Sequence, residues 1–400
     1  MEGLPREIGG GTIPIKAWAF YLEAGAEQQA RNAANHPFAF HHIALMPDAH
    51  QGEGICIGGV VPTRGVVLPA GCGVDIGCGM RSVKTSLNIN DVNKELLLKI
   101  REDILHQIPV GFDHRTTPLK DKMPVMDRAA FEQSAVVKAE WDSATYQIGT
   151  LGSGNHFWSA LQDNEGNIYI LLHSGSRNIG NKTALYYEKL AKQLNEEWSW
   201  DAKIPPSWKL NFLPLAGKNK KYGEAYMREM DWCLDFARVN RQVMMDITQI
   251  VFTKHTGCTF SDGLDIWHNY AAWEHHFGED IIVHRKGATS AKLGQLGIIP
   301  GSQGTKSYIV RGKGNPESFK SCSHGAGRTM SRSSAKATLD LDAEQQKLDG
   351  LGVLHGMTEI GKLDEADSAY KDIAEVLANE NDLVEIVVEL SPNNLPVIKG

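Results

Sequence analysis

A dense run from His41 to Val83 decides the fold and reads HHIALMPDAHQGEGICIGGVVPTRGVVLPAGCGVDIGCGMRSV. Two pieces of this run, 55–61 and 65–68, are rich in β-branched residues, and glycine and proline separate them. Such pieces are typical of strands joined by tight turns. Short apolar pieces between 281 and 311 predict further strands that end in polar loops, and 384–390 predicts a strand followed by an ordered tail.

Helices are expected on both sides of this run. Residues 23–35 predict the first helix, and 92–107 and 178–198 have the pattern of amphipathic surface helices. The clearest apolar periodicity lies between 222 and 251, where it predicts a long helix that faces the core. Helices and strands that alternate without a fixed repeat predict an α+β fold.

Two features do not fit a regular pattern. Asn240 and Arg241 interrupt the apolar stripe of the long helix, and we expect them to face solvent or to form a buried polar network. Residues 201–221 contain three prolines and a basic tail, so they predict a loop excursion that is either a surface insertion or a lid.

Composition excludes several classes of protein. With 400 residues, 42% of them hydrophobic and 22% charged, the chain can bury a large core, which excludes disordered and fibrous proteins. The net charge of −7 excludes a broad basic surface for nucleic acid, so any polyanion must be held locally. Six scattered cysteines, no signal peptide and no apolar run of about 18 residues predict a cytoplasmic protein with free thiols and no membrane contact.

The sharpest chemical feature is VDIGCGM, which places Asp75 and Cys78 on one glycine-rich bend. Carboxylate, thiolate and imidazole bind transition metals, but a buried cysteine beside a turn-forming aspartate would also explain this pair. Four histidines lie in similar glycine-rich or polar contexts next to apolar pieces, and together they favour a shared site: His156, His173, His268 and His324. Because these candidate ligands come singly from distant segments, they favour a catalytic metal centre over a structural zinc site.

Cationic side chains accompany these histidines, and solvated surface positions are the alternative explanation for them. Guanidinium groups and exposed backbone amides bind phosphate, so the cations predict a phosphorylated substrate. The candidates are Arg177, Arg285, Lys286, Arg328 and Arg332. P-loop, dinucleotide-binding and HExxH signatures are absent from the sequence. KLDG at 347–350 matches a short nucleotidyl-lysine signature, but a helix that stops at Gly350 explains it better.

The ordered motifs of this chain resemble the RtcB family of tRNA-splicing ligases, which join RNA ends. The matching motifs cover nearly the whole chain and are MPDAHQGEG, VDIGCGM, LGSGNHF, LHSGSR, HNY, RKGA, IPGSQG, SHGAGRTMSR, AYKDI and the terminal KG. The resemblance implies one large catalytic domain over residues 1–400, with mixed sheets around a central cleft that contains metal. It also implies two Mn²⁺ ions, GTP as energy source, and RNA with a 2′,3′-cyclic phosphate or 3′-phosphate and a 5′-hydroxyl as substrate.

The resemblance further assigns roles to residues. His324 would carry GMP as a covalent histidine adduct, which passes to the RNA 3′-phosphate before the 5′-hydroxyl attacks. The metal ligands would be Asp75, Cys78, His156, His173 and His268, with the Cys78 sulfur between the two ions. The nucleotide pocket would contain Asn155, Ser302, His324, Gly325, Ala326, Gly327, Tyr370 and Lys399.

One position departs from the family. The family usually has a glutamate three residues after the GNH histidine, where it binds the guanine edge, and this chain has Ser159. A hydroxyl cannot accept two hydrogen bonds from guanine as a carboxylate does, so guanine preference is expected to be weaker or to depend on another acid. A metal-dependent RNA-end phosphoesterase and an RNA-end binding protein remain alternatives to a ligase, and an activating protein partner stays open.

Overall fold

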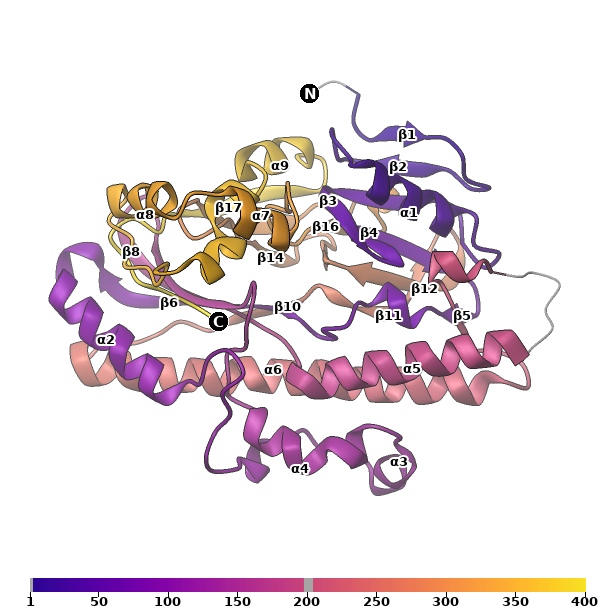
Figure 1. The fold of residues 1–400 in the computed structure, drawn as a ribbon, viewed down its shortest axis with the longest axis horizontal. Coiled ribbons are helices and arrows are strands. Elements are labelled where there is room, and N and C mark those ends of the chain that lie inside the picture. Colours follow the sequence, from indigo (N-terminus) through magenta and orange to yellow (C-terminus); the bar gives the residue numbers. More distant parts are fainter. Residues whose placement is uncertain (1–2, 198–203) are drawn as a thin grey trace.

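The computed structural model describes residues 3–197 and 204–400. A six-stranded sheet has the order β1-β2-β3-β4-β12-β11, in which only β2 and β3 pair in parallel (Figure 1). Its strands are β1 Arg6–Ile8, β2 Ile15–Ala17, β3 Ile43–Glu53, β4 Ile55–Thr63, β12 Glu279–Lys286 and β11 Asn269–His276. The deciding run thus forms adjacent strands and the turn between them, and the strands predicted at 55–61 and 65–68 are confirmed as β4 and β5.

A five-stranded antiparallel sheet has the order β10-β6-β8-β7-β18. Its strands are β10 Leu264–Trp267, β6 Gly79–Asn88, β8 Asn167–Ser174, β7 Phe157–Gln162 and β18 Val397–Lys399. Gly79 pairs with both Trp267 and Ser174, and His173 pairs with both Met80 and Phe157. In an antiparallel pair, one strand starts beside the end of the other. The residues just before β6 and β7 therefore lie beside the last residues of β8 and β10, at one end of the strands.

Smaller sheets complete the strand structure. They contain β13 with β16, β14 with β15 and β17, and β5 with β9. The bounds are β5 Val66–Val67, β9 Leu213–Pro214, β13 Ala288–Ser290, β14 Leu296–Ile299, β15 Ser307–Gly312, β16 Ser321–Ser323 and β17 Val384–Leu390. The predicted strands between 281 and 311 and at 384–390 are therefore confirmed, and the tail is ordered because β18 pairs with β7.

Helices cover the sheets. The long helices α5 and α6 run side by side beneath the strands, and α3 and α4 lie outside them (Figure 1). The helices are α1 Ala24–Ala34, α2 Lys94–Gln107, α3 Arg128–Gln133, α4 Val137–Gln147, α5 Arg177–Glu197, α6 Lys220–Thr256, α7 Arg332–Thr338, α8 Leu341–Gly350 and α9 Ile373–Asn379. The helices predicted at 23–35, 92–107 and 178–198 are confirmed, apart from residue 198, which lies outside the described residues. As expected, α8 ends at Gly350.

The long helix α6 differs from the prediction in length, because it continues on both sides of 222–251 and ends where Gly257 takes a positive φ of 71°. Asn240 and Arg241, which interrupt its apolar stripe, form a buried polar network, which is one of the two arrangements expected from the sequence. Asn240 donates to Gly175 O at 3.1 Å, and Arg241 donates to Gly77 O at 3.0 Å and to Ser174 O at 2.9 Å. These bonds fasten α6 to the loops that lead into β6 and out of β8.

The predicted excursion at 201–221 is only partly irregular. Residues 201–203 lie outside the described residues. Further on, β9 pairs with β5, Leu210 and Phe212 are buried, and the final two residues already belong to α6. In the described part this connection packs against the body. No helix among the described residues has the length and apolarity needed to cross a membrane.

His284 on β12 links strands from two parts of the chain. Its Nδ1 donates to Val61 O at 2.7 Å, and its Nε2 accepts from the Leu68 N–H at 2.9 Å. Burial lowers the pKa of His284 to about 4, and a protonated ring could not accept the Leu68 bond. The fold therefore requires the neutral imidazole.

We expect His284→Gln to change how stability depends on pH. Below the unfolded pKa of 6.5 the unfolded wild-type chain binds a proton that folded His284 does not, so stability falls as pH falls toward about 4. Glutamine does not titrate, so by pH 5 the variant should be spared about 2 kcal/mol of this loss. Urea unfolding at pH 7 and pH 5 measures it, with exposed His106→Gln as control. Parallel pH profiles for wild type and His284→Gln would contradict the assignment.

Candidate functional site

Five predicted metal ligands meet at the end of the five-stranded sheet where β6 and β7 start and β8 and β10 end. Cys78 Sγ lies 3.4 Å from His156 Nε2 and 3.2 Å from His173 Nε2, and these three ligand atoms lie within 4.8 Å of one another. His268 Nε2 lies 3.4 Å from His173 Nε2, and Asp75 Oδ2 lies 3.0 Å from His156 Nε2. The structure thus brings all five side chains together.

The chemistry of this cluster fits a cation. His173 Nδ1 donates to Asn155 O at 3.0 Å, which leaves the lone pair of Nε2 facing Cys78. Burial, followed by the nearby histidines, lowers the pKa of His173 and of His268, so both rings are neutral. Asp75 Oδ1 and His268 Nδ1 are buried and have no hydrogen-bond partner among the described residues. A carboxylate oxygen, a sulfur and imidazole nitrogens gathered in this way are the ligand set that a metal centre requires.

Burial and neighbouring charged groups shift the pKa values of Cys78 and Asp75. Burial raises the pKa of the Cys78 thiol, and Asp75 raises it further, so a metal ion would be needed to hold the thiolate. Burial would also raise the pKa of Asp75, but His156 and Arg177 lower it below the usual value. Arg177, the first residue of α5, lies with Nη1 3.3 Å from His156 Nδ1, and its Nε donates to Thr150 Oγ1 at 3.2 Å. This arginine is therefore part of the site.

His324 follows β16 and is held by a carboxylate that the sequence did not reveal. Its Nδ1 donates to Asp48 Oδ2 at 2.6 Å, and its backbone N–H donates to the same oxygen at 3.1 Å. Asp48 on β3 is fully buried; burial would raise its pKa, but His324 lowers it. Since a carboxylate only accepts, Nδ1 carries the proton of this bond, and in a neutral ring the lone pair lies on Nε2. The His324 ring centroid lies 4.9 Å from that of His268, next to the predicted metal ligands.

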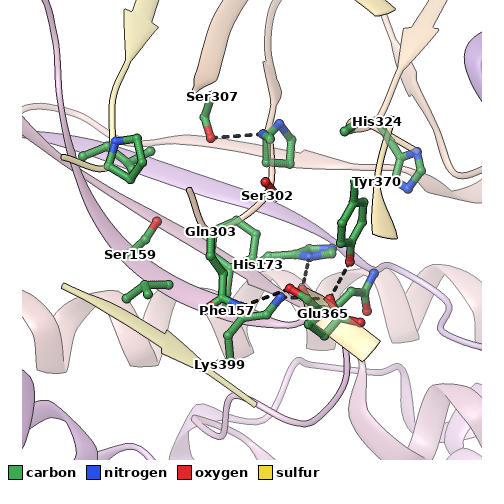
Figure 2. A pocket seen from close by; sticks show the side chains of 18 of the residues that line it. Phe157, Ser159, His173, Ser302, Gln303, Ser307, His324, Glu365, Tyr370 and Lys399 are labelled. Atoms are coloured by element: carbon green, nitrogen blue, oxygen red, sulfur yellow. Dashed lines mark hydrogen bonds and ion pairs between the residues drawn. The ribbon is translucent and has the colours of Figure 1, made fainter. Parts of the chain in front are cut away.

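A cavity of ≈ 350 Å³ opens beside His324 (Figure 2). All the residues predicted for the nucleotide pocket line it: Asn155, Ser302, His324, Gly325, Ala326, Gly327, Tyr370 and Lys399. Ser159 lines it too, which puts the position that departs from the family on the cavity wall. Leu161, Pro300 and Val397 add apolar side chains to the wall. The cavity therefore combines apolar surface with a small number of polar groups, as pockets for small molecules do.

Glu365 is a second candidate functional residue that the sequence did not reveal. Tyr370 Oη donates to Glu365 at 2.5 Å and Lys399 Nζ at 3.0 Å, so both side chains point to this carboxylate (Figure 2). Arg328 and Arg332 approach its other oxygen at 3.4 and 3.5 Å. Burial would raise the pKa of Glu365, but Lys399 and Tyr370 lower it below the usual value. Among the lining residues, which all lie in the described part of the chain, Glu365 is the only carboxylate.

The prediction for Arg285 and Lys286 requires correction. Arg285 is fully buried, donates to Glu274 Oε1 at 2.5 Å and to Phe319 O at 2.9 Å, and thus has a structural role. Lys286 is 8% exposed and donates to the carbonyls of Glu53 and Ala70. The guanidinium and the ammonium both bind groups of the protein interior, and neither residue lines the cavity described above. Arg328 and Arg332, in contrast, line the cavity.

The chain is similar to known proteins along most of its length. A family model described as tRNA-splicing ligase RtcB matches residues 29–400. The chain is 40% identical to the RNA-splicing ligase RtcB of Escherichia coli (strain K12), over 94% of this chain and 95% of that protein. It is 31% identical to the tRNA-splicing ligase RtcB of Archaeoglobus fulgidus (95% and 92%) and 30% identical to that of Nanoarchaeum equitans (99% and 97%). A match of this extent shows that the chain belongs to the RtcB family.

Proposed function

We propose that this chain ligates RNA ends, joining a 3′-phosphate or 2′,3′-cyclic phosphate to a 5′-hydroxyl through a nucleotide carried on His324. The observation that carries the proposal is the position of His324. Its Nδ1 is held by Asp48, and its ring lies between the ligand cluster and the nucleotide-sized cavity. Family membership and the names of the relatives support the same reaction.

The reaction divides into transfers at phosphorus. The Nε2 lone pair of His324 attacks the α-phosphorus of GTP, forming an N–P bond while the bond to pyrophosphate breaks. An oxygen of the RNA 3′-phosphate then attacks the same phosphorus, and the bond to His324 breaks. Finally the 5′-hydroxyl attacks the RNA phosphorus, loses its proton and releases GMP. A 2′,3′-cyclic phosphate must first be opened by water to give the 3′-phosphate.

Each protein group has a task in these transfers. Asp48 keeps the proton on Nδ1, so Nε2 is the nucleophile, and it stabilises the positive charge that develops on the ring. Arg177 lies beside the ligand cluster and Arg332 lies at the cavity, where both can pair with phosphate oxygens. Because recognition of an end requires only a few such contacts, a net charge of −7 is compatible with an RNA substrate.

Asp75, Cys78, His156, His173 and His268 would hold the metal, which we propose to be two Mn²⁺ ions. Bound divalent ions would neutralise charge on the attacking and leaving oxygens. A thiolate with three imidazoles binds Zn²⁺ more tightly than Mn²⁺ in the general order of affinities, so a manganese preference would have to come from availability or geometry.

Tyr370 and Lys399 are proposed to contact the base. The ring of Tyr370 can pack against a purine, and the ammonium of Lys399 can donate to a carbonyl such as guanine O6. Ser159 adds only a hydroxyl, so Glu365 is the single acid in the cavity wall that can organise recognition. The guanine preference is therefore proposed to depend on how Glu365 holds its two partners.

Two other functions would use the same ligand cluster. A phosphoesterase would open cyclic phosphates without ligation, and a binding protein would hold RNA ends without reaction. Neither needs a nucleophilic imidazole beside a nucleotide cavity, so the Asp48–His324 pair supports ligation over both. The six cysteines are all free, which supports our proposal of a cytoplasmic location.

We expect incubation with GTP and Mn²⁺ to add one GMP to the protein, and intact-mass and peptide mass spectrometry to place it on His324. His324→Ala should abolish the adduct, and Asp48→Asn should slow its formation roughly 10²- to 10⁴-fold by losing the orienting carboxylate. The exposed His275→Ala serves as control. A wild-type protein that gains no adduct from any nucleoside triphosphate, or an unchanged adduct in His324→Ala, would rule the mechanism out.

We expect Cys78→Ala to lose bound metal, while Cys72→Ala, a buried thiol in the same segment, keeps it. Loss of a direct ligand should weaken metal affinity by more than the roughly 10- to 100-fold that loss of an outer partner costs. Equilibrium dialysis against Mn²⁺ with elemental analysis measures the affinity, and circular dichroism checks the fold. Equal metal content in both variants would argue against the cluster as the site.

We expect Glu365→Gln to raise the KM for GTP and to reduce the preference for GTP over ATP. A hydrogen bond to a charged group contributes about 1.5–3 kcal/mol, which corresponds to a roughly 10- to 100-fold weaker nucleotide affinity. Glu344→Gln is a matched control, because Glu344 is also a buried carboxylate with a lysine and a hydroxyl partner but lies outside the cavity wall. Unchanged base preference in Glu365→Gln would assign Glu365 a structural role only.

A further inference from the structure

A second cavity of ≈ 320 Å³ adjoins the nucleotide cavity. His50, Arg328 and Tyr370 line both cavities, so these three side chains form a common wall. The remaining lining residues come from 20–23, 47–49, 329 and 371–379. The activity proposed above accounts for the first cavity and leaves the second without a role.

Two consecutive aromatic residues stand at the second cavity. Phe20 is 63% exposed and Tyr21 is 72% exposed, although neighbouring Trp18 and Leu22 are buried. Trp18 Nε1 donates to the carboxylate of Asp382 at 3.0 Å, which anchors the segment on one side. The segment is thus fixed to the body while two large rings remain in solvent. These residues also precede residue 29, where the match to the family begins.

The segment is fixed on its other side as well. Glu23 immediately precedes α1 and accepts a hydrogen bond from the Gln51 backbone N–H at 2.6 Å. Gln51 follows His50, which belongs to the common wall. The backbone that carries the two rings is therefore anchored next to the common wall. Exposed aromatic side chains on anchored backbone are the kind on which unpaired bases stack.

The charges of the second cavity do not suit a phosphate. Its carboxylates are Glu23, Asp372 and Glu375, against the cations Arg328 and Lys371. Lys371 is already used, because its Nζ donates to Ala49 O at 2.7 Å and to Pro47 O at 3.2 Å. Arg328 donates to Asp364 O at 2.7 Å and approaches Glu365. An uncharged flat ring fits these surroundings better than an anion does.

A buried polar atom without a partner gives an independent indication of a ligand. Asn379 lines the cavity, is 6% exposed, and its Oδ1 has no hydrogen-bond partner among the described residues. A buried carbonyl oxygen without a donor costs free energy unless a ligand supplies one. The exocyclic amine or ring N–H of a nucleobase is such a donor.

We propose that the second cavity receives the unpaired base of the RNA nucleotide that carries the 3′-phosphate, with Phe20 and Tyr21 as its stacking platform. The inference rests on the proposed function. His324 holds one nucleotide in the first cavity, and the RNA 3′-phosphate must approach the same phosphorus. A base site on the other side of the His50–Arg328–Tyr370 wall would keep the RNA end beside that phosphorus without competing for the first cavity.

The test separates the histidine step from the RNA step. Enzyme already carrying GMP is mixed with an oligoribonucleotide that has a 3′-phosphate, and the capped 3′ end is measured without a 5′-hydroxyl acceptor. The Phe20→Ala, Tyr21→Ala double variant should need roughly 10- to 100-fold more RNA for half-maximal rate, as expected for loss of base stacking. Its formation of the His324 adduct from GTP should be unchanged. Phe112→Ala, 92% exposed elsewhere on the molecule, is the matched control.

An RNA whose 3′-terminal nucleotide lacks its base provides the second arm. The RNA concentration that the wild type needs for half-maximal rate should rise on this RNA by about the same factor as it rises for the double variant on intact RNA. The double variant should lose little more when the base is removed, because both changes remove one interaction. Phe20→Trp should retain affinity for intact RNA.

Several outcomes would overturn the proposal. The first is that wild type and double variant need the same RNA concentration for half-maximal rate. The second is that the double substitution and the removal of the base raise this concentration independently, by factors that multiply. An unchanged RNA response together with loss of a response to an added protein would instead identify the cavity as a protein-docking site. Failure of the wild type to form the His324 adduct would count against the proposed function, so the two failures can be told apart.

Discussion

The proposed function depends on the convergence of carboxylate and imidazole side chains around the sulfur of Cys78. Antiparallel pairing brings the start of β6 and β7 to the end of β8 and β10, so thiol, carboxylate and imidazoles converge from distant parts of the sequence. Such a convergence costs free energy when it is buried without protons or a cation. The surrounding fold must hold it in place, and α6 does so, since Arg241 binds the carbonyls of Gly77 and Ser174 beside two of the ligands.

His324, the proposed nucleophile, is placed by a different part of the molecule. Asp48 comes from the six-stranded sheet and His324 from the segment after β16, and their hydrogen bond connects that sheet to the region of the Cys78 cluster. Glu365 has the same role at the far end of the cavity, where one buried carboxylate holds Tyr370 and Lys399. His324, Tyr370 and Lys399 are thus each held by a buried acid. In the proposed reaction this arrangement would fix geometry before the nucleotide binds, which is the main contribution a protein can make to phosphoryl transfer.

Much of this could be predicted from sequence, and the remainder has physical reasons. The predicted ligands are recognisable because glycine-rich turns and strand ends mark each of them locally, as in VDIGCGM. Asp48 and His324 are 276 positions apart and no pattern in either segment indicates the bond. The sequence does not indicate Glu365 for the same reason, since its four partners are brought together only by the fold. The sequence around Arg285 predicts a phosphate contact because the pairing with Glu274 across β11 and β12 depends on the hairpin, which local sequence does not reveal.

We infer that the Cys78 cluster binds metal next to His324. Anomalous diffraction from crystals soaked in Mn²⁺, recorded on both sides of the manganese absorption edge, tests it most directly. We predict difference peaks about 2–2.6 Å from Cys78 Sγ and from the Nε2 atoms of the surrounding histidines. Peaks confined to surface carboxylates, with none among Cys78, His156, His173 and His268, would contradict the account.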